Sequence, residues 1–129
     1  MTILIVDASV TVVTKIEELL LDMSFQNLNI KTYSNAQEAL EYINDYEVDL
    51  IFSSIETEGI DGITFIDLIV RNYPNYVSHL FIVTSQVDSD NFKEVKGVGA
   101  KRFIKKPINE EYFRHFVAPE IHKALKNEA

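Results

Sequence analysis

The chain repeats one pattern of apolar and polar positions five times. Each repeat opens with a short strand-like segment and continues with a segment whose apolar residues recur at helical spacing. The strand-like segments lie at residues 2–6, 30–33, 48–53, 80–83 and 102–104. Those at 2–6, 48–53 and 80–83 are largely apolar, which is typical of strands that are buried on both faces of a parallel sheet, whereas 30–33 and 102–104 are short and contain Lys31 and Arg102. The pattern therefore predicts five strands, each followed by a helix.

Capping residues mark where the first three helices begin. Residues 12–23 place their apolar side chains on one helix face, and Ser9 just before them is the predicted N-cap. Ser34 and Gln37 have the spacing of a capping box ahead of the second helix, and Asp61 is the predicted cap of the third.

Prolines and a further cap delimit the remaining helices. The third helix is expected to end at Tyr73-Pro74, because the residue before a proline disfavours helical backbone. A weakly patterned fourth helix is expected over 88–96. Asn109 is the predicted cap of the last helix, and Pro119 is expected to kink or restart it, since proline cannot donate a backbone hydrogen bond.

Five alternations of strand and helix predict an α/β fold. We expect a flavodoxin-like (βα)5 doubly wound parallel sheet with strand order 2-1-3-4-5. The 129 residues suffice for a single domain, 1–129. In such a sheet, chemistry sits at the carboxyl ends of the strands. That edge would gather five polar side chains: Asp7, Ser54, Glu56, Thr84 and Lys106.

Composition narrows the function classes. The chain contains no cysteine, which excludes disulfides and thiolate metal sites and fits a reducing, cytoplasmic setting. No signal peptide is recognisable, and no apolar run approaches the ~20 residues of a membrane span. The net charge of −8 argues against nucleic acid as a partner, because phosphate binding needs a basic footprint.

Charge is distributed unevenly along the chain. Residues 1–90 contain 15 acidic and 3 basic side chains, whereas residues 91–129 contain 9 basic and 5 acidic ones. The asymmetry has two interpretations: an ordinary solvated surface, or a basic face near the C-terminus for an acidic partner.

Four segments together carry a resemblance to a known family. Residues 3–9, 49–62, 83–85 and 99–107 resemble the receiver domains of two-component response regulators, and the resemblance covers essentially the whole chain. It implies a signalling protein in which two adjacent acids after the first strand hold magnesium. It also implies a phosphoacceptor aspartate after the third strand, a hydroxyl after the fourth, and a Lys-Pro pair after the fifth.

The chain departs from that family pattern at two positions. Asp7 matches the first acid, but Ala8 stands in place of the second and Ser54 in place of the phosphoacceptor. Glu56 falls where the family supplies a metal ligand through a backbone carbonyl. We therefore expect no cofactor, weak or absent magnesium binding, and no enzymatic activity, because an unaided serine is a weak nucleophile. These substitutions indicate a degenerate receiver.

Three further residues match positions of the family pattern. Thr84 matches the switch hydroxyl, Phe103 matches the aromatic switch position, and Lys106, followed by Pro107, matches the Lys-Pro pair. Without an aspartyl phosphate to contact, Lys106 is expected to pair with Asp7 or Glu56. Phe103 is placed by the resemblance near the surface, between the fourth strand and the last helix.

The favoured function is phosphorylation-independent signalling through the face formed by helix four, strand five and helix five. The partner would be another signalling protein, such as a histidine kinase or an effector. An aromatic centre with a basic rim suits an acidic partner. The residues proposed for this face are Lys93, Lys96, Lys101, Arg102, Phe103, Lys105, Tyr112, Phe113 and Arg114.

Several alternatives remain open. Modification of Ser54, or ligand or metal binding in the Asp7/Ser54/Glu56 pocket, would provide another form of regulation. A nucleotide or flavin site is disfavoured because residues 7–11 contain no glycine. A homodimer through the helix-four face is a further alternative. His79, His115 and His122 show no metal-binding spacing.

Overall fold

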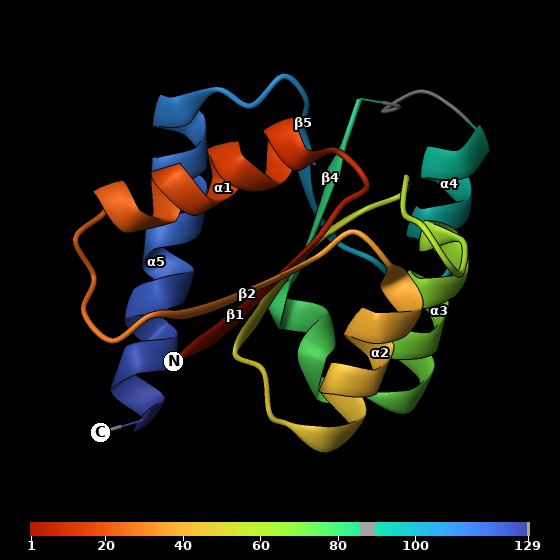
Figure 1. The fold of residues 1–129 in the computed structure, drawn as a ribbon, viewed down its shortest axis with the longest axis horizontal. Coiled ribbons are helices and arrows are strands. Elements are labelled where there is room, and N and C mark those ends of the chain that lie inside the picture. The colour runs from red at the N-terminus through yellow and green to blue at the C-terminus, as the bar shows by residue number, and fades with distance from the viewer. Residues whose placement is uncertain (86–89, 129) are drawn as a thin grey trace.

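Five parallel strands form one sheet with helices on both faces (Figure 1). The structure is a computed structural model, and it describes residues 1–85 and 90–128. The strand order is β2-β1-β3-β4-β5, and every neighbouring pair is parallel. Both the predicted fold class and the strand order are confirmed. The strands are β1 (Thr2–Val6), β2 (Asn29–Tyr33), β3 (Leu50–Ser54), β4 (Leu80–Thr84) and β5 (Arg102–Lys105).

The helices form two layers around the sheet (Figure 1). One face carries α1 (Val10–Asp22) and α5 (Glu110–Glu128). The opposite face carries α2 (Ala36–Asp45), α3 (Gly62–Asn72) and α4 (Asp90–Gly97). A short 3-10 helix, η1 (Pro74–His79), follows α3 and was not predicted. Residues 88 and 89 of the predicted fourth helix lie outside the described residues.

Successive side chains of a strand point to opposite faces of the sheet and pack into two separate hydrophobic cores. In β1, Ile3 and Ile5 pack toward α1 and α5, whereas Leu4 and Val6 pack toward α2 and α3. All four side chains are fully buried. A strand that is covered on both faces needs apolar residues at consecutive positions. This requirement explains the unbroken apolar runs in the sequence.

Three predicted caps are confirmed. The Oγ of Ser9 accepts a hydrogen bond from the backbone N–H of Val12 at 3.3 Å. The Oδ1 of Asp61 accepts from Ile63, and the Oδ1 of Asn109 accepts from Tyr112. Each cap satisfies a backbone donor that the first turn of its helix leaves unpaired.

The predicted cap of α2 was wrong by one residue. The cap is Asn35, whose Oδ1 accepts from the backbone N–H groups of Gln37 and Glu38 at 2.9 and 3.2 Å. Ser34 is instead held through its carbonyl, which accepts from the N–H of Glu58 at 2.9 Å. A contact distant in sequence thus fixes the residue at which this helix begins.

The expected restart of the last helix does not occur, because α5 continues through Pro119. Pro119 itself is exposed, whereas Phe113, Val117 and Ile121 are fully buried against the sheet. Burial of this apolar stripe on both sides of the proline offsets the hydrogen bond that proline cannot make.

Candidate functional site

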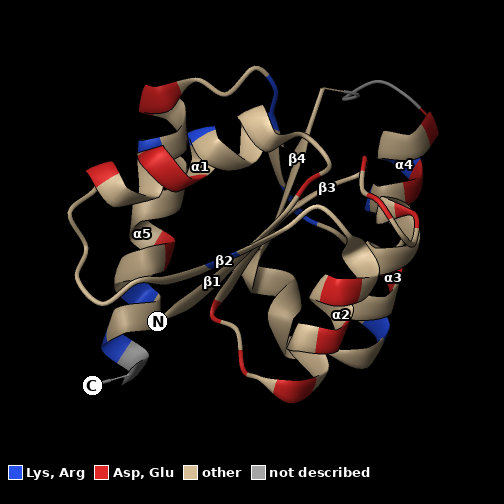
Figure 2. Ribbon diagram, in the orientation of Figure 1, with Lys and Arg blue, Asp and Glu red and all other residues tan. Residues whose placement is uncertain are grey.

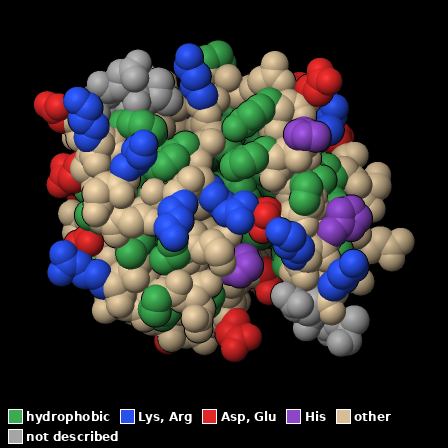
Figure 3. Space-filling view, turned by 180° about the vertical axis from the view of Figure 1, so that it is seen from behind, with side chains coloured by type: hydrophobic (Ala, Val, Ile, Leu, Met, Phe, Trp, Pro, Cys, Tyr) green, Lys and Arg blue, Asp and Glu red, His purple; other side chains and the backbone are tan. Residues whose placement is uncertain are grey.

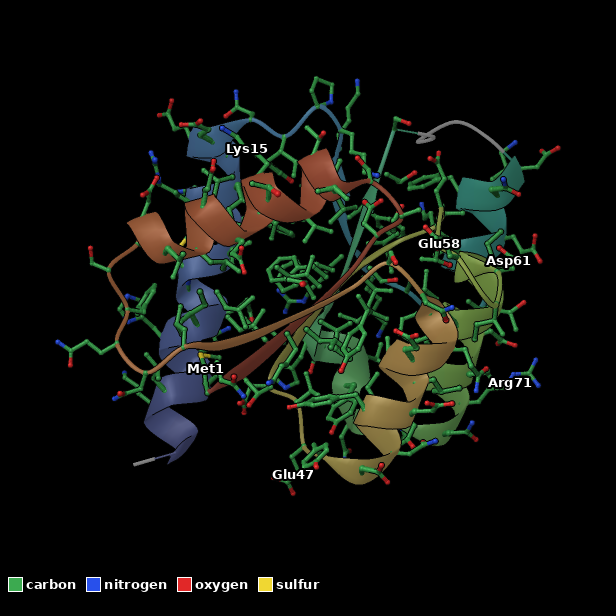
Figure 4. All side chains as sticks on the ribbon, viewed as in Figure 1. Met1, Lys15, Glu47, Glu58, Asp61 and Arg71 are labelled. Carbon is green, nitrogen blue, oxygen red and sulfur yellow. The ribbon has the colours of Figure 1, made fainter. Side chains whose placement is uncertain are left out.

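The loop after β3 is fixed against the start of α2. The carbonyl of Glu58 accepts a hydrogen bond from the N–H of Ala36 at 2.8 Å, and Figure 4 shows Glu58 beside the first turn of α2. Gly59 has a φ of +80°, and a Cβ there would lie 2.3 Å from the Oδ1 of Asn35. A Cβ at Gly62 would lie 2.1 Å from the carbonyl oxygen of Ile55. Glycine is therefore required at both turns that shape this edge of the site.

Asp7 lies at the carboxyl end of β1 and is only 2% exposed. Its backbone N–H donates to the carbonyl of Tyr33 at 3.0 Å, which extends the β1–β2 pairing by one residue. Its Oδ1 accepts from the N–H of Ser9 at 2.9 Å. The carboxylate is thus held in a fixed orientation at the sheet edge.

Lys106, in the segment directly after β5, contacts this carboxylate with its side chain. Its Nζ lies 2.8 Å from the Oδ2 of Asp7 and 3.3 Å from the Oγ of Ser54. Its backbone N–H donates to the carbonyl of Thr84 at 3.0 Å. One lysine therefore links the ends of β1, β3 and β4. The side chains of Lys106 and Asp7 are 15% and 2% exposed, so the ion pair is largely shielded from water.

Ser54 and Glu56 complete this edge. The Ser54 hydroxyl is buried, and its Oγ accepts from the backbone N–H of Glu56 at 2.9 Å as well as from Lys106. The side chain of Glu56 is exposed, while its backbone carbonyl accepts from the N–H of Ala8 at 3.0 Å. Asp7 and Glu56 were the two partners expected for Lys106, and in the structure Lys106 pairs with Asp7.

Thr84, at the end of β4, is also buried, at 3% exposure.

The three histidines lie apart from this edge. His122 packs edge-on against Phe25, with ring centroids 4.9 Å apart, and His115 is exposed on α5. His79 lies at the end of η1 with its Nδ1 buried and unpaired. Within residues 1–85 and 90–128, no three His, Asp or Glu side chains come together as a metal-binding group.

Phe103 packs on a different side of β5 than the sequence indicated. Its ring makes an edge-to-face contact with Phe92 of α4, with centroids 4.7 Å apart, rather than lying between β4 and α5. The Nζ of Lys96 lies 5.6 Å from the centre of the Phe92 ring. The expectation failed because neighbouring residues point to opposite faces of a strand. Ile104 occupies the α5 side, and Phe103 therefore faces α4.

Two more residues expected on this surface are engaged elsewhere. Phe113 is fully buried and stacks on Phe52, so it belongs to the core and not to a binding face. Arg102 turns toward α5, where it forms a 2.9 Å ion pair with Glu120 and lies 5.5 Å from the centre of the Phe81 ring. Glu120 was missed, although its place on the apolar stripe of α5 signals that it is buried.

The remaining residues form an exposed, basic surface. Lys93, Lys96, Lys101 and Lys105 are all exposed along α4 and β5. Tyr112 is 48% exposed and stacks on Phe116, and Arg114 forms a 3.7 Å ion pair with Glu110. Figure 3 shows Lys and Arg side chains across the face that includes β5, with hydrophobic side chains between them. Figure 2 shows acidic residues on α2 and on the loop after β3, and also on α1, on α4 and at the start of α5.

No helix in the described part of the chain is long and apolar enough to span a membrane.

Solved receiver structures have the same fold. A signal receiver domain of an HD domain-containing protein from Pseudomonas fluorescens superposes with a TM-score of 0.81 at 20% identity, covering 98% of this chain and 90% of that one. The chemotaxis response regulator CheY4 of Vibrio cholerae gives 0.76 at 23% identity, covering 92% and 97%. NtrX from Brucella abortus gives 0.77 at 25% identity, covering 98% of this chain and 28% of that one.

Sequence comparisons agree with the structural ones. The chain is 31% identical over 92 residues to a cyclic di-GMP phosphodiesterase of Thermotoga maritima. The match covers 71% of this chain and 24% of that protein, so it spans about a quarter of the relative's length. The family model described as response regulator receiver domain matches residues 3–118. The chain therefore belongs to the response regulator receiver domain family.

Proposed function

We propose that this receiver domain signals without aspartyl phosphorylation, by binding another signalling protein through α4, β5 and α5. The observation that carries the proposal is the position of Lys106, whose ammonium group lies between Asp7 and the Ser54 hydroxyl. A cation in that position holds the carboxyl edge of the sheet together without a phosphoryl group.

The charge of this pocket does not suit magnesium. Hard divalent cations bind where several carboxylate oxygens converge. Here Asp7 is paired with Lys106, Ala8 contributes no oxygen from its side chain, and the Glu56 side chain is exposed. The Asp7–Lys106 pair has no net charge, so it offers a divalent cation little attraction.

The surroundings of Ser54 do not favour its use as a nucleophile. A serine becomes reactive when a neighbouring base accepts its proton. The side chain 3.3 Å from its Oγ is Lys106, which donates to Ser54 and pairs with Asp7, so it is not placed as a base. We propose that Ser54 is a structural hydrogen-bond acceptor in an inert pocket.

The surface of α4 and β5 fits an acidic partner. It carries exposed lysines on the same two elements as the Phe92–Phe103 pair, with Lys96 over the Phe92 ring, so it combines apolar and positively charged groups. Receiver domains generally act by contacting other signalling proteins. We propose that the partner presents acidic side chains around an apolar anchor.

The absence of phosphorylation is tested by incubation with acetyl phosphate, or with beryllofluoride, each in the presence of Mg²⁺. The expected result is an unchanged intact mass and unchanged amide NMR spectra. Stoichiometric uptake of a phosphoryl group, or a Mg²⁺-dependent change at Asp7 or Ser54, would overturn this part of the proposal.

The binding surface is tested by affinity capture with wild-type protein, Phe103→Ala and the double variant Lys93→Glu/Lys101→Glu. Capture of a specific signalling protein is expected to be lost in both variants. It is expected to persist in Arg71→Glu, which reverses an exposed charge on α3, where Figure 4 shows Arg71 pointing outward. Equal capture by all four proteins would show that the surface is wrong. Light scattering distinguishes such a partner from a homodimer.

A further inference from the structure

A small hollow opens between α1 and the end of β2, next to the Asp7–Lys106 pair. Its volume is about 240 Å³. It lies on the β2 side of the sheet, away from the basic surface of α4 and β5. The residues that line it are Asp7, Val10, Val13, Thr14, Glu17, Thr32, Tyr33 and Ser34.

The lining combines carboxylates, hydroxyls and aliphatic side chains. Val10, Val13, Thr14 and Glu17 follow one another at helical spacing and share one face of α1. Val10 is 76% exposed, so its side chain is accessible to a ligand. The hollow thus provides an aliphatic wall beside hydrogen-bonding groups.

Glu17 supplies an available negative charge. Among the residues that the structure describes, no cation pairs with this half-buried carboxylate. Two lysines near the hollow, Lys15 on α1 and Lys106 at the sheet edge, already form ion pairs with other carboxylates. Lys15 donates to Glu110, and Lys106 binds Asp7.

Lys31 of β2 does not neutralise the hollow either. It is paired in register with Leu4, whose side chain packs toward α2 and α3, on the opposite face of the sheet. The neighbouring Thr32 lines the hollow on the α1 side. The Glu17 carboxylate has no cationic partner among the described residues, and hydroxyl groups lie around it in the lining. Such a set of groups favours a positively charged ligand over a neutral or negative one.

We propose that this hollow binds a small organic amine in its protonated form. The ammonium group is held by Glu17 and the surrounding hydroxyls, and a short aliphatic stem lies against Val10 and Val13. The volume is below the roughly 300–1,000 Å³ of sites for drug-sized ligands, which suits a stem of a few carbons. This site is separate from the surface of the proposed function and does not depend on it.

Asp7 connects the amine site with the edge of the sheet. Asp7 lines the hollow, and its carboxylate binds Lys106. A bound amine would therefore contact the residue that holds Lys106, which is why a smaller response is expected at Lys106.

The test is an amide NMR titration of the intact chain with n-butylammonium chloride. Five non-hydrogen atoms and one charged contact lead us to expect a dissociation constant on the order of 1–10 mM. Saturable shifts are expected at Val10, Val13, Glu17 and Thr32, with a smaller response at Lys106. Equal concentrations of 1-butanol, which has the same shape but no charge, and of sodium chloride should produce no saturable shift.

Glu17→Gln and Glu18→Gln provide a matched pair of variants. Each removes one negative charge from α1, but Glu18 is exposed and is not among the residues that line the hollow. Glu17→Gln is expected to weaken binding about tenfold or more, and Glu18→Gln less than about twofold. The spectrum of each variant shows at the same time whether it is folded. Equal affinities in the two variants, or equal shifts with 1-butanol, would overturn the proposal.

Discussion

The ammonium group of Lys106 lies 2.8 Å from the Oδ2 of Asp7, a residue 99 positions earlier in the chain. The pair joins the first strand of the sheet to the segment after the last strand. Asp7 is nearly fully buried, and its carboxylate oxygens are satisfied by this partner and by the N–H of Ser9. The same lysine also donates to Ser54.

Removing the lysine should therefore destabilise the protein more than removing the aspartate charge. Lys106→Met leaves a buried carboxylate without its cation, and a loss of about 3–5 kcal/mol in the free energy of unfolding is expected. Asp7→Asn should cost less, because the lysine can extend to water. Urea denaturation measures both, with Lys105→Met, an exposed neighbour, as the control. Similar losses for Lys105→Met and Lys106→Met would contradict the role of the pair.

Restoring the missing acids should create a magnesium site. The double variant Ala8→Asp/Ser54→Asp adds two carboxylates beside Asp7, giving the pocket a net negative charge that a divalent cation can neutralise. We expect beryllofluoride with Mg²⁺ to raise its melting temperature by about 5 °C or more. Calorimetry of the wild type and of Ala8→Asp alone should show no such rise. A response in either of these two would indicate that Ser54 does not block the chemistry.

The contact between Phe92 and Phe103 should couple α4 to β5. Their rings meet edge to face at 4.7 Å, an arrangement worth about 1 kcal/mol beyond the area it buries. Phe92→Leu and Phe103→Leu should therefore be non-additive in unfolding free energy by about that amount. Phe116→Leu, on the other face of the sheet, should be additive with Phe103→Leu. Additivity in both pairs would show that the contact carries no coupling.

The pKa of the Glu110 carboxyl should rise when Lys15 is replaced. A hydrogen bond from Lys15 and its positive charge hold the pKa of Glu110 below the ordinary value of 4.5. Figure 4 shows Lys15 of α1 beside the start of α5. Carboxyl NMR titration of Lys15→Met should return the pKa toward the ordinary value, whereas Lys31→Met should not change it.

The same pair sets the sign of a pH effect on stability. Because the folded-state pKa is lowered, the contribution of Glu110 is present above the unfolded-state value and is lost as the pH falls through the lowered pKa. The stability difference between wild type and Lys15→Met should therefore shrink on acidification. It should also shrink with added salt, because both side chains are exposed to solvent. A difference that grows on acidification would contradict this assignment.

The local pattern of the sequence was enough to determine the architecture. Consecutive apolar residues from Thr2 to Val6 require a strand covered on both faces, and helical spacing after each strand requires a crossover. Polar residues at the strand ends, including Asp7 and Ser54, then fall on one edge of the sheet. These features depend on residues close together in the chain, and so periodicity reveals them.

Only the tertiary structure decided which of these residues meet. It selected Asp7 rather than Glu56 for Lys106, Asn35 rather than Ser34 as the cap of α2, and α4 rather than α5 as the neighbour of Phe103. Each choice depends on distances between segments far apart in sequence and on the direction in which a side chain leaves its strand. Packing of α5 against the sheet likewise continued the helix through Pro119, where local propensity alone predicted a kink or a restart.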